Sequence, residues 1–299
     1  MKKIFLGMIV IIVLLSCSTN SDDKLRIGII APSLNHFPLD FAVESGIIQQ
    51  DDFIIKRFSS GWETNEALVA GKIDLAILPF TYIWSDVALD KKVKIISFLE
   101  RESDGIIAKK EIENIGDLDG KKIGVLRAST LDIFAEMLAE ENNIIPQFVY
   151  FRTPMEMAAA LNAEEVDALS FYVPSIFNFN SRFHVLHWYS KDYPHHPCCD
   201  LAATEVALKT KSDQIQAFMT SLNESSEKMI RDPQVAIERA RVAFRISEQT
   251  SKKSLYNTKF IMNLDESGKD FEMKAIQKML EKGYIQSTVK PENVYYEFK

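Results

Sequence analysis

Cysteine is scarce in this chain, with only three among 299 residues. Small domains held together by disulfides need more, so that class of protein is excluded. Basic residues are also in the minority, with 35 Lys and Arg against 42 Asp and Glu and a formal net charge of −7. Because nucleic-acid affinity depends on Lys and Arg that neutralise phosphates, an acidic chain without a basic run argues against that partner. We therefore expect no nucleic-acid binding.

Long apolar runs are scarce as well, and one of them lies at the N-terminus. Lys2 and Lys3 precede an apolar segment from Ile4 to Leu15. This segment is shorter than the roughly 20 residues that cross a bilayer, and a basic start with a short apolar core is typical of a secretory signal. No other apolar stretch is long enough to span a membrane. We therefore expect the chain to be exported.

The apolar segment ends in Leu14-Leu15-Ser16-Cys17, which resembles the lipobox of bacterial lipoproteins. That resemblance implies a signal peptide over residues 1–16, a lipid anchor on Cys17 and a lipidated tether over residues 17–24. We expect the protein to be anchored by lipid to the extracytoplasmic face of a membrane in the cell envelope. The alternatives are an ordinary signal peptide with an incidental cysteine and an uncleaved anchor helix.

Strand and helix signals alternate after the tether, and the pattern occurs twice. Residues 24–30, 53–58 and 73–77 are echoed by residues 121–126, 148–152 and 166–170. The offset is nearly constant, at 96 residues between Ile27 and Ile123 and 93 between Asp74 and Asp167. Alternating strands and helices are typical of a mainly parallel sheet covered by helices. The repeat therefore predicts an α/β fold with two similar lobes.

The segment between the two copies, residues 94–109, has the pattern of extended chain that leaves one lobe and enters the next. The chain turns helical after Asp200, and we expect this tail to pack on the first lobe. The prediction is that residues 25–104 and 201–299 form lobe 1 and that residues 105–200 form lobe 2. Two crossing segments form a hinge, and the cleft between the lobes is the expected ligand site.

Four groups of residues carry a family resemblance. They are Ala31-Pro32 to Phe37-Pro38-Leu39 with Ala42 and Gly46, then Gly71 to Ala76, Gly120 to Gly124, and His196-Pro197-Cys198-Cys199. In this order the chain resembles the type 2 periplasmic binding protein fold, and within it the ABC-importer receptors for nitrate, sulfonates, bicarbonate and thiamine precursors. The resemblance implies a solute-binding receptor that works with a permease and an ATPase. It does not identify the solute.

Ligands gather at the carboxyl ends of the strands in open α/β sheets. The loops at these ends, together with the segment at the second crossing, supply the candidate ligand-binding residues. They are Asn35, His36, Phe37, Ser59, Ser60, Gly61, Trp62, Thr81, Ser129, Thr130, Tyr172 and His196. The N–H groups near Ser60 suit an anion or a carbonyl oxygen, with a simple N-cap as the alternative. Ser129 and Asp132 have the spacing of a capping box, and the charge of Asp132 would oppose a bare anion.

Aromatic residues accompany these loops, among them Trp62, Tyr82 and Tyr172. Flat rings beside a cleft suit a planar or apolar ligand, although each ring can equally belong to the core or the rim. We therefore expect a small organic solute, with heterocycles and sulfonate-type compounds as candidates, bound by a monomer.

Four of the five histidines lie between His184 and His196, just before Cys198 and Cys199. Imidazole and thiolate groups bind zinc and copper well, but adjacent cysteines chelate one ion awkwardly and no C-x-x-C spacing is present. The family resemblance implies instead that this segment shapes the hinge or the cleft wall. We predict no metal and no cofactor; a metal-binding lipoprotein, a vicinal disulfide and thiol chemistry are the alternatives.

Catalysis has little support in the sequence. The fungal thiamine-pyrimidine synthases share the fold of the family and use a cysteine-rich segment, so an enzyme of that kind is an alternative. Those enzymes work inside cells, and this chain has no matching lysine for pyridoxal phosphate and no nucleophile–base arrangement. We therefore predict a receptor and no enzyme, with a sensor that feeds a signalling protein as a further alternative.

Overall fold

The computed structural model describes residues 24–31 and 33–298, so the predicted signal peptide, Cys17 and all of the tether except Lys24 lie outside the described residues. The strands are β1 (Leu25–Ile30), β2 (Phe53–Phe58), β3 (Leu75–Pro79), β4 (Val93–Arg101), β5 (Asp104–Lys109), β6 (Lys122–Leu126), β7 (Gln147–Phe151), β8 (Ala168–Tyr172), β9 (Phe183–Trp188), β10 (Pro197–Thr204) and β11 (Lys259–Phe260). The α-helices are α1 (Phe37–Glu44), α2 (Gly61–Val69), α3 (Phe80–Ala88), α4 (Thr130–Glu141), α5 (Pro154–Asn162), α6 (Glu205–Thr210), α7 (Ser212–Arg231), α8 (Pro233–Phe244), α9 (Glu248–Tyr256), α10 (Glu266–Glu281) and α11 (Pro291–Val294). Over the described ranges, no helix is long and apolar enough to cross a membrane.

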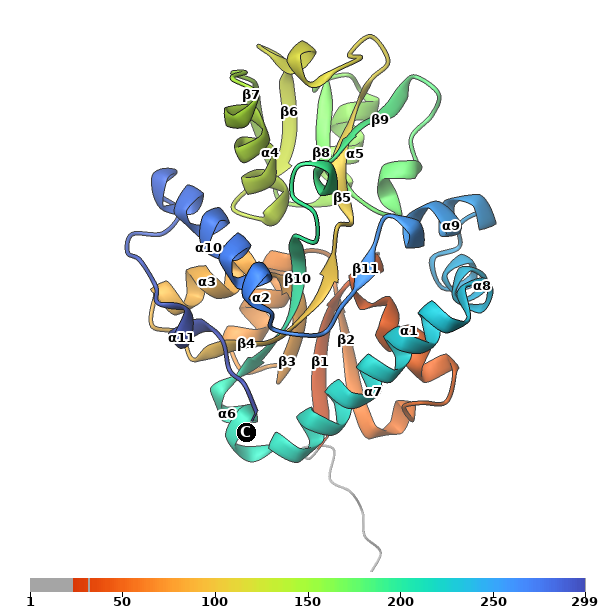
Figure 1. Ribbon diagram of the computed structural model, residues 1–299, viewed down its shortest axis with the longest axis vertical. Helices are drawn as coiled ribbons and strands as arrows, with labels where there is room; N and C mark the ends of the chain where they lie inside the picture. Colours follow the sequence, from red (N-terminus) through yellow and green to blue (C-terminus); the bar gives the residue numbers. More distant parts are fainter. Residues whose placement is uncertain (1–23, 32, 299) are drawn as a thin grey trace, which may run out of the picture.

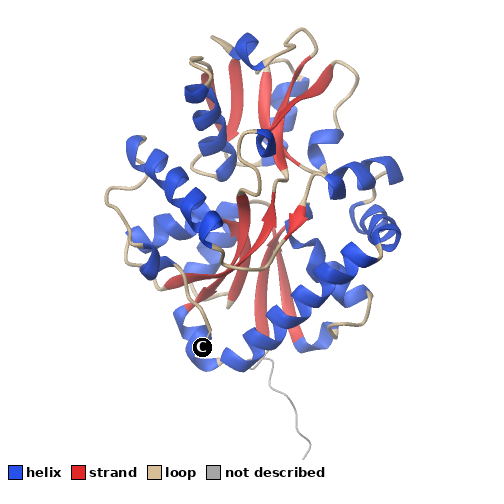
Figure 2. Cartoon of the chain, in the orientation of Figure 1, coloured by secondary structure: helices blue, strands red, loops and turns tan. Residues whose placement is uncertain are grey.

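The strands form two sheets, each flanked by helices (Figures 1 and 2). The first has the order β11-β4-β10-β3-β1-β2 and the second the order β7-β6-β8-β5-β9. In the first sheet β1 pairs in parallel with β2 and β3, and in the second β6 pairs in the same way with β7 and β8. These three-strand units are the two copies of the sequence repeat, so the prediction of a two-lobed α/β fold is confirmed.

The repeat extends to individual side chains. Asp74, before β3, accepts a hydrogen bond at 2.9 Å from the backbone N–H of Arg26 in β1. Asp167, before β8, accepts one at 3.0 Å from the N–H of Lys122 in β6. Each carboxylate joins the start of one strand to its parallel neighbour, which explains why the two aspartates recur in the repeat.

The chain crosses between the lobes twice, from β4 to β5 and from β9 to β10 (Figure 1). Residues 197–200, placed in lobe 2 by the sequence-based division, lie in β10 and pair with β3 and β4 of the first sheet. Asp104, placed in lobe 1, begins β5 and pairs with Tyr172 in the second sheet. The strand pairing therefore differs from that division by a few residues at each crossing.

The helical tail contacts both lobes. Helix α7 packs on α1 in the first lobe, whereas α10 packs on both α3 and α4, and α4 belongs to the second lobe. Three lysines four residues apart, two in α10 and one at its C-cap, pair with glutamates of α4. These pairs are Lys274 with Glu141, Lys278 with Glu140 and Lys282 with Glu136. Helix α10 is therefore an electrostatic bridge between the lobes in addition to the two crossings.

Reversing one charge of this bridge is expected to favour an open arrangement of the lobes. In Lys278→Glu, the new carboxylate faces Glu140, and repulsion replaces attraction between α10 and α4. We expect a larger radius of gyration for the ligand-free variant in small-angle X-ray scattering, and a smaller difference from wild type at high salt. Lys252→Glu, an exposed change of equal charge on α9, is the control. Equal radii for the two variants would contradict the bridge.

Candidate ligand-binding site

A cavity of about 50 Å³ lies between the lobes where the crossing strands meet. The first lobe contributes residues at the carboxyl ends of β1 and β3, Ile30 and Pro79, and the second lobe contributes Leu126 and Tyr172 at the ends of β6 and β8. The first residues of α2, α4 and α5 complete the rim. Parallel strands thus bring their carboxyl ends to one place, as expected for a ligand site in this kind of sheet.

Half of the residues predicted to bind ligand line this cavity. They are Asn35, Ser60, Gly61, Ser129, Thr130 and Tyr172. The other six predicted residues, His36, Phe37, Ser59, Trp62, Thr81 and His196, are absent from the lining. Phe37 and Thr81 are buried in the protein interior, and Trp62 is 59% exposed on the surface.

The two predicted histidines are buried and bonded elsewhere. The ring nitrogens of His36 lie 3.1 Å from Oδ1 of Asn35 and 3.2 Å from a carboxylate oxygen of Asp40. His196 bonds the carbonyl oxygen of Tyr193 through Nδ1 at 2.7 Å, and its ring packs edge-on against Phe134. Burial lowers the pKa of His196 to about 4, so its imidazole is neutral near pH 7.

The serines at the two helix starts use their side chains differently. Ser60 caps α2 by accepting from the N–H of Glu63 at 3.2 Å. The predicted capping box at α4 is wrong, because Ser129 makes no cap bond. Its hydroxyl donates to the carbonyl of Leu126, while Asp132 accepts from the N–H of Ala128. Both side chains therefore bond the backbone of the turn that precedes α4.

Two buried carboxyl groups at the first crossing were missed. Glu100 near the end of β4 and Asp104 at the start of β5 both line the cavity, and both are almost completely buried. Burial, together with the nearby charge of Asp104, raises the pKa of Glu100 to about 8. Burial also raises the pKa of Asp104 to about 6. The signal that could have found them was the acidic residues between two apolar stretches, residues 95–99 and 106–108, at the predicted crossing.

Cys198 and Cys199 both line the cavity, although they are neighbours in one strand. Adjacent side chains of a regular strand point to opposite faces, but β10 has register shifts on either side of Cys199 that break this alternation. Their sulfur atoms lie 3.8 Å apart and form no disulfide. The neighbouring Cys199 and burial raise the pKa of the Cys198 thiol, and burial raises that of Cys199.

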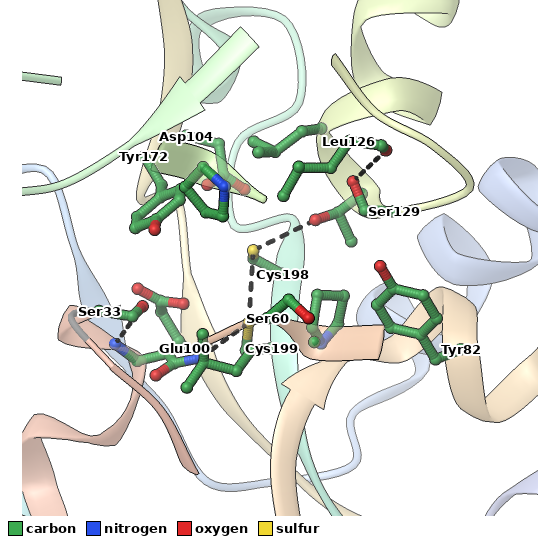
Figure 3. A pocket seen from close by; sticks show the side chains of 17 residues that line it. Ser33, Ser60, Tyr82, Glu100, Asp104, Leu126, Ser129, Tyr172, Cys198 and Cys199 are labelled. Carbon is green, nitrogen blue, oxygen red and sulfur yellow. Dashed lines mark hydrogen bonds between the residues drawn. The ribbon is translucent and has the colours of Figure 1, made fainter. Parts of the chain in front are cut away.

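The thiols also contact both sides of the cavity. Cys199 accepts from the amide of Asn35 in the first lobe at 3.4 Å, and Cys198 lies 3.5 Å from the hydroxyl of Thr130 in the second (Figure 3). The two sulfur atoms thus link the floor of the cavity to both lobes.

The ionisable groups among the described residues that line the cavity are all acids, and none is a base. Glu100 and Asp104 are its ionisable carboxyl groups, and no Lys, Arg or His is among the described lining residues. A buried charge is costly unless an opposite charge or several hydrogen bonds accompany it. The cavity therefore suits a ligand that donates hydrogen bonds or carries positive charge better than it suits an anion.

Most of the sequence matches the model of a known protein family. Residues 52–236 match the model described as NMT1/THI5 like, which is more than half of the sequence. The chain belongs to the NMT1/THI5-like family. No curated protein matches the sequence.

Solved structures agree with this family on the fold. An alkanesulfonate-binding protein from Xanthomonas axonopodis pv. citri, bound to MOPS, has a TM-score of 0.81 at 15% identity, covering 92% of this chain and 99% of its own. The ligand-binding component of an ABC-type import system from Staphylococcus aureus, with zinc bound, has a TM-score of 0.77 at 18% identity, covering 92% and 97%. The nitrate-binding protein of Synechocystis has a TM-score of 0.75 at 14% identity, covering 91% and 86%. The predicted two-lobed periplasmic binding protein fold is therefore confirmed.

Proposed function

We propose that this protein is the extracytoplasmic solute-binding receptor of an ABC importer. Family membership, the two-lobed fold and a cavity at the crossings support this role. The similar structures include a component of an ABC-type import system and proteins named for alkanesulfonate and nitrate binding. The partners are then a membrane permease and its ATPase. In this proposal the protein is a lipid-anchored monomer, held through Cys17, that binds its solute without changing it.

The solute that the cavity favours is a small organic compound with a cationic or hydrogen-bond-donating group. The observation that carries this choice is the pair of buried carboxyl groups, Glu100 and Asp104, in a lining with no basic side chain among its described residues. A sulfonate or nitrate would be buried against these groups without a counter-charge. Tyr82 and Tyr172 also line the cavity and offer ring faces to a flat molecule. A heterocycle that bears an amino or amidine group meets both conditions.

Binding must involve movement of the lobes. A cavity of about 50 Å³ holds little more than a few water molecules, so a ring-sized solute needs the lobes to part before it enters. A solute shifts the balance between open and closed forms only if it binds the closed form more tightly. Contacts from both lobes, such as those of Glu100 and Asp104, supply that difference.

The test uses two flat probes of similar size and opposite charge, benzamidine and benzenesulfonate, together with nitrate and a panel of aminopyrimidines. We expect the cationic or amino compounds to raise the melting temperature of the purified chain, and calorimetry to measure their affinity. Asp104→Asn should weaken their binding about 10- to 100-fold, the range for a lost hydrogen bond to a charged group. Native mass spectrometry should recover the bound compound with unchanged mass.

The control variant is Asp90→Asn, which removes an exposed carboxylate far from the cavity lining and should leave binding unchanged. Tight binding of benzenesulfonate or nitrate, without binding of the cationic probes, would contradict the proposed solute class while leaving the receptor role in place. Conversion of a bound compound into a product of different mass would contradict the receptor role.

A further inference from the structure

Three donor atoms for a metal ion meet at the floor of the cavity. They are the sulfur atoms of Cys198 and Cys199 and a carboxylate oxygen of Glu100, and all lie within 4.8 Å of one another. All three residues are buried. In Figure 3 Asp104 lies on the other side of Cys198 from Glu100 and Cys199, and its carboxyl group is close enough to the Cys198 thiol to interact with it.

The β-bulge in β10 removes the main objection to a metal site here. The sequence alone predicted no metal, partly because neighbouring cysteines chelate one ion awkwardly. The register shifts on either side of Cys199 turn both thiols toward the cavity, where each reaches a different lobe. Bulges commonly re-aim side chains in this way beside functional sites.

The separation of the sulfur atoms fits tetrahedral coordination. Two thiolates bound to zinc at about 2.3 Å lie about 3.8 Å apart when the angle is tetrahedral. The sulfur atoms of Cys198 and Cys199 are 3.8 Å apart. Two thiols in van der Waals contact also lie about this far apart. The distance therefore supports a metal site only in combination with the nearby carboxylate oxygen of Glu100.

A further carboxyl group, that of Asp104, lies next to the Cys198 thiol but outside the group of three donors. Asp104 is 1% exposed, and its Oδ2 has no hydrogen-bond partner among the described residues. Buried polar atoms without a partner are rare and costly. Zinc bound by the two sulfur atoms and Glu100 has a fourth coordination position, and a small movement of Asp104 toward it would give Oδ2 its missing partner.

We propose that Cys198, Cys199 and Glu100 form a binding site for a thiophilic divalent cation of the zinc type, which Asp104 completes as the fourth donor by moving toward the ion. On binding, each thiol and the carboxyl group of Glu100 release their protons to solvent, and the two sulfur atoms and a Glu100 oxygen form bonds to the ion. The two thiolates balance the charge of the ion, and the Glu100 carboxylate adds one negative charge. Soft sulfur donors select zinc-type ions over magnesium and calcium, which prefer oxygen ligands alone. The site shares the cavity with the proposed solute but does not depend on the importer role.

The probe is Zn²⁺ alone, titrated by calorimetry into the purified full chain under a phosphine reductant. A thiol assay on the denatured protein confirms that the cysteines are reduced. We expect one zinc per chain, no binding of Mg²⁺, and thiolate-to-metal charge-transfer absorption with Co²⁺. Cys199→Ser and Glu100→Gln should each weaken zinc binding by roughly 10- to 100-fold or more. Glu100→Gln preserves the shape of the side chain, which keeps the test valid if the serine variant is poorly folded.

His195→Asn is the matched control. His195 is exposed, pairs with Glu102 and belongs to the histidine-rich segment, but it is outside the four donors. We expect it to bind zinc as wild type does. Absence of one-to-one zinc binding, binding that survives in Cys199→Ser and Glu100→Gln, or binding lost in His195→Asn would overturn the inference. If the chain binds the organic probes but does not bind Zn²⁺, the zinc site is overturned and the proposed function stands.

Discussion

Replacing Arg101 with methionine is expected to lower the free energy of unfolding by about 3–5 kcal/mol, the range for breaking a buried ion pair. Arg101 ends β4 and is 2% exposed. Its guanidinium pairs with Asp265, the N-cap of α10, and donates to the carbonyl of His195 in the second crossing at 3.0 Å. One side chain thus joins both crossings and α10. Methionine keeps an unbranched apolar stem beside Phe98 but removes the donor to Oδ2 of Asp265 and to the carbonyl of His195.

Urea unfolding followed by circular dichroism measures this loss. The control is Arg241→Met, because the ion pair that Arg241 forms within the described part of the chain is with Glu238 on its own exposed helix face. An exposed pair contributes little, so we expect its unfolding curve to overlay that of wild type. A loss below about 1 kcal/mol for Arg101→Met would place Arg101 in the class of exposed pairs and would contradict its role in joining the crossings.

Replacing Glu272 with glutamine is expected to flatten the dependence of stability on pH. Glu272 is fully buried, and its Oε2 accepts from Nε1 of Trp84 at 2.7 Å and from the hydroxyl of Tyr295 at 2.8 Å. Burial raises its pKa from 4.5 to about 7, despite hydrogen bonds that favour the charged form. Between these two values the folded chain holds a proton that the unfolded chain releases. The contribution of Glu272 is therefore complete below about pH 4.5 and is lost as the pH rises through about 7.

Glutamine accepts the same two hydrogen bonds through its amide oxygen but carries no charge at any pH. We expect the difference in unfolding free energy between variant and wild type to grow in favour of the variant from pH 5 to pH 8. The size of this change is on the order of 3 kcal/mol. Every other titrating group is common to both proteins, and the neighbouring Asp200 interacts with Glu272, so subtraction isolates the contribution of this buried pair. Parallel stability curves over this pH range would contradict the raised pKa.

The strand repeat shows what local pattern can predict. Asp74 and Asp167 occupy equivalent turns and bond equivalent strands, so the offset between them carried real structural information. Alternation and helix periodicity reflect the local backbone and the burial of one face, and both are visible along the chain. The loops at the strand ends could be located for the same reason. Ser60, Thr130 and Tyr172, which were predicted from their places in these loops, line the cavity.

The sequence by itself determined the two-lobed α/β architecture, the order of the repeated strands and the acidic character of the chain. Only the tertiary structure decided which side chains meet. Glu100 and Asp104 face the cavity because two crossing strands converge there, and His196 faces Tyr193 and Phe134 instead. A one-residue irregularity beside Cys199 changes the face of the sheet on which a thiol lies. The alternation of polar and apolar residues in the sequence does not reveal such an irregularity. Convergence of segments about 100 residues apart depends on packing, which local periodicity does not encode.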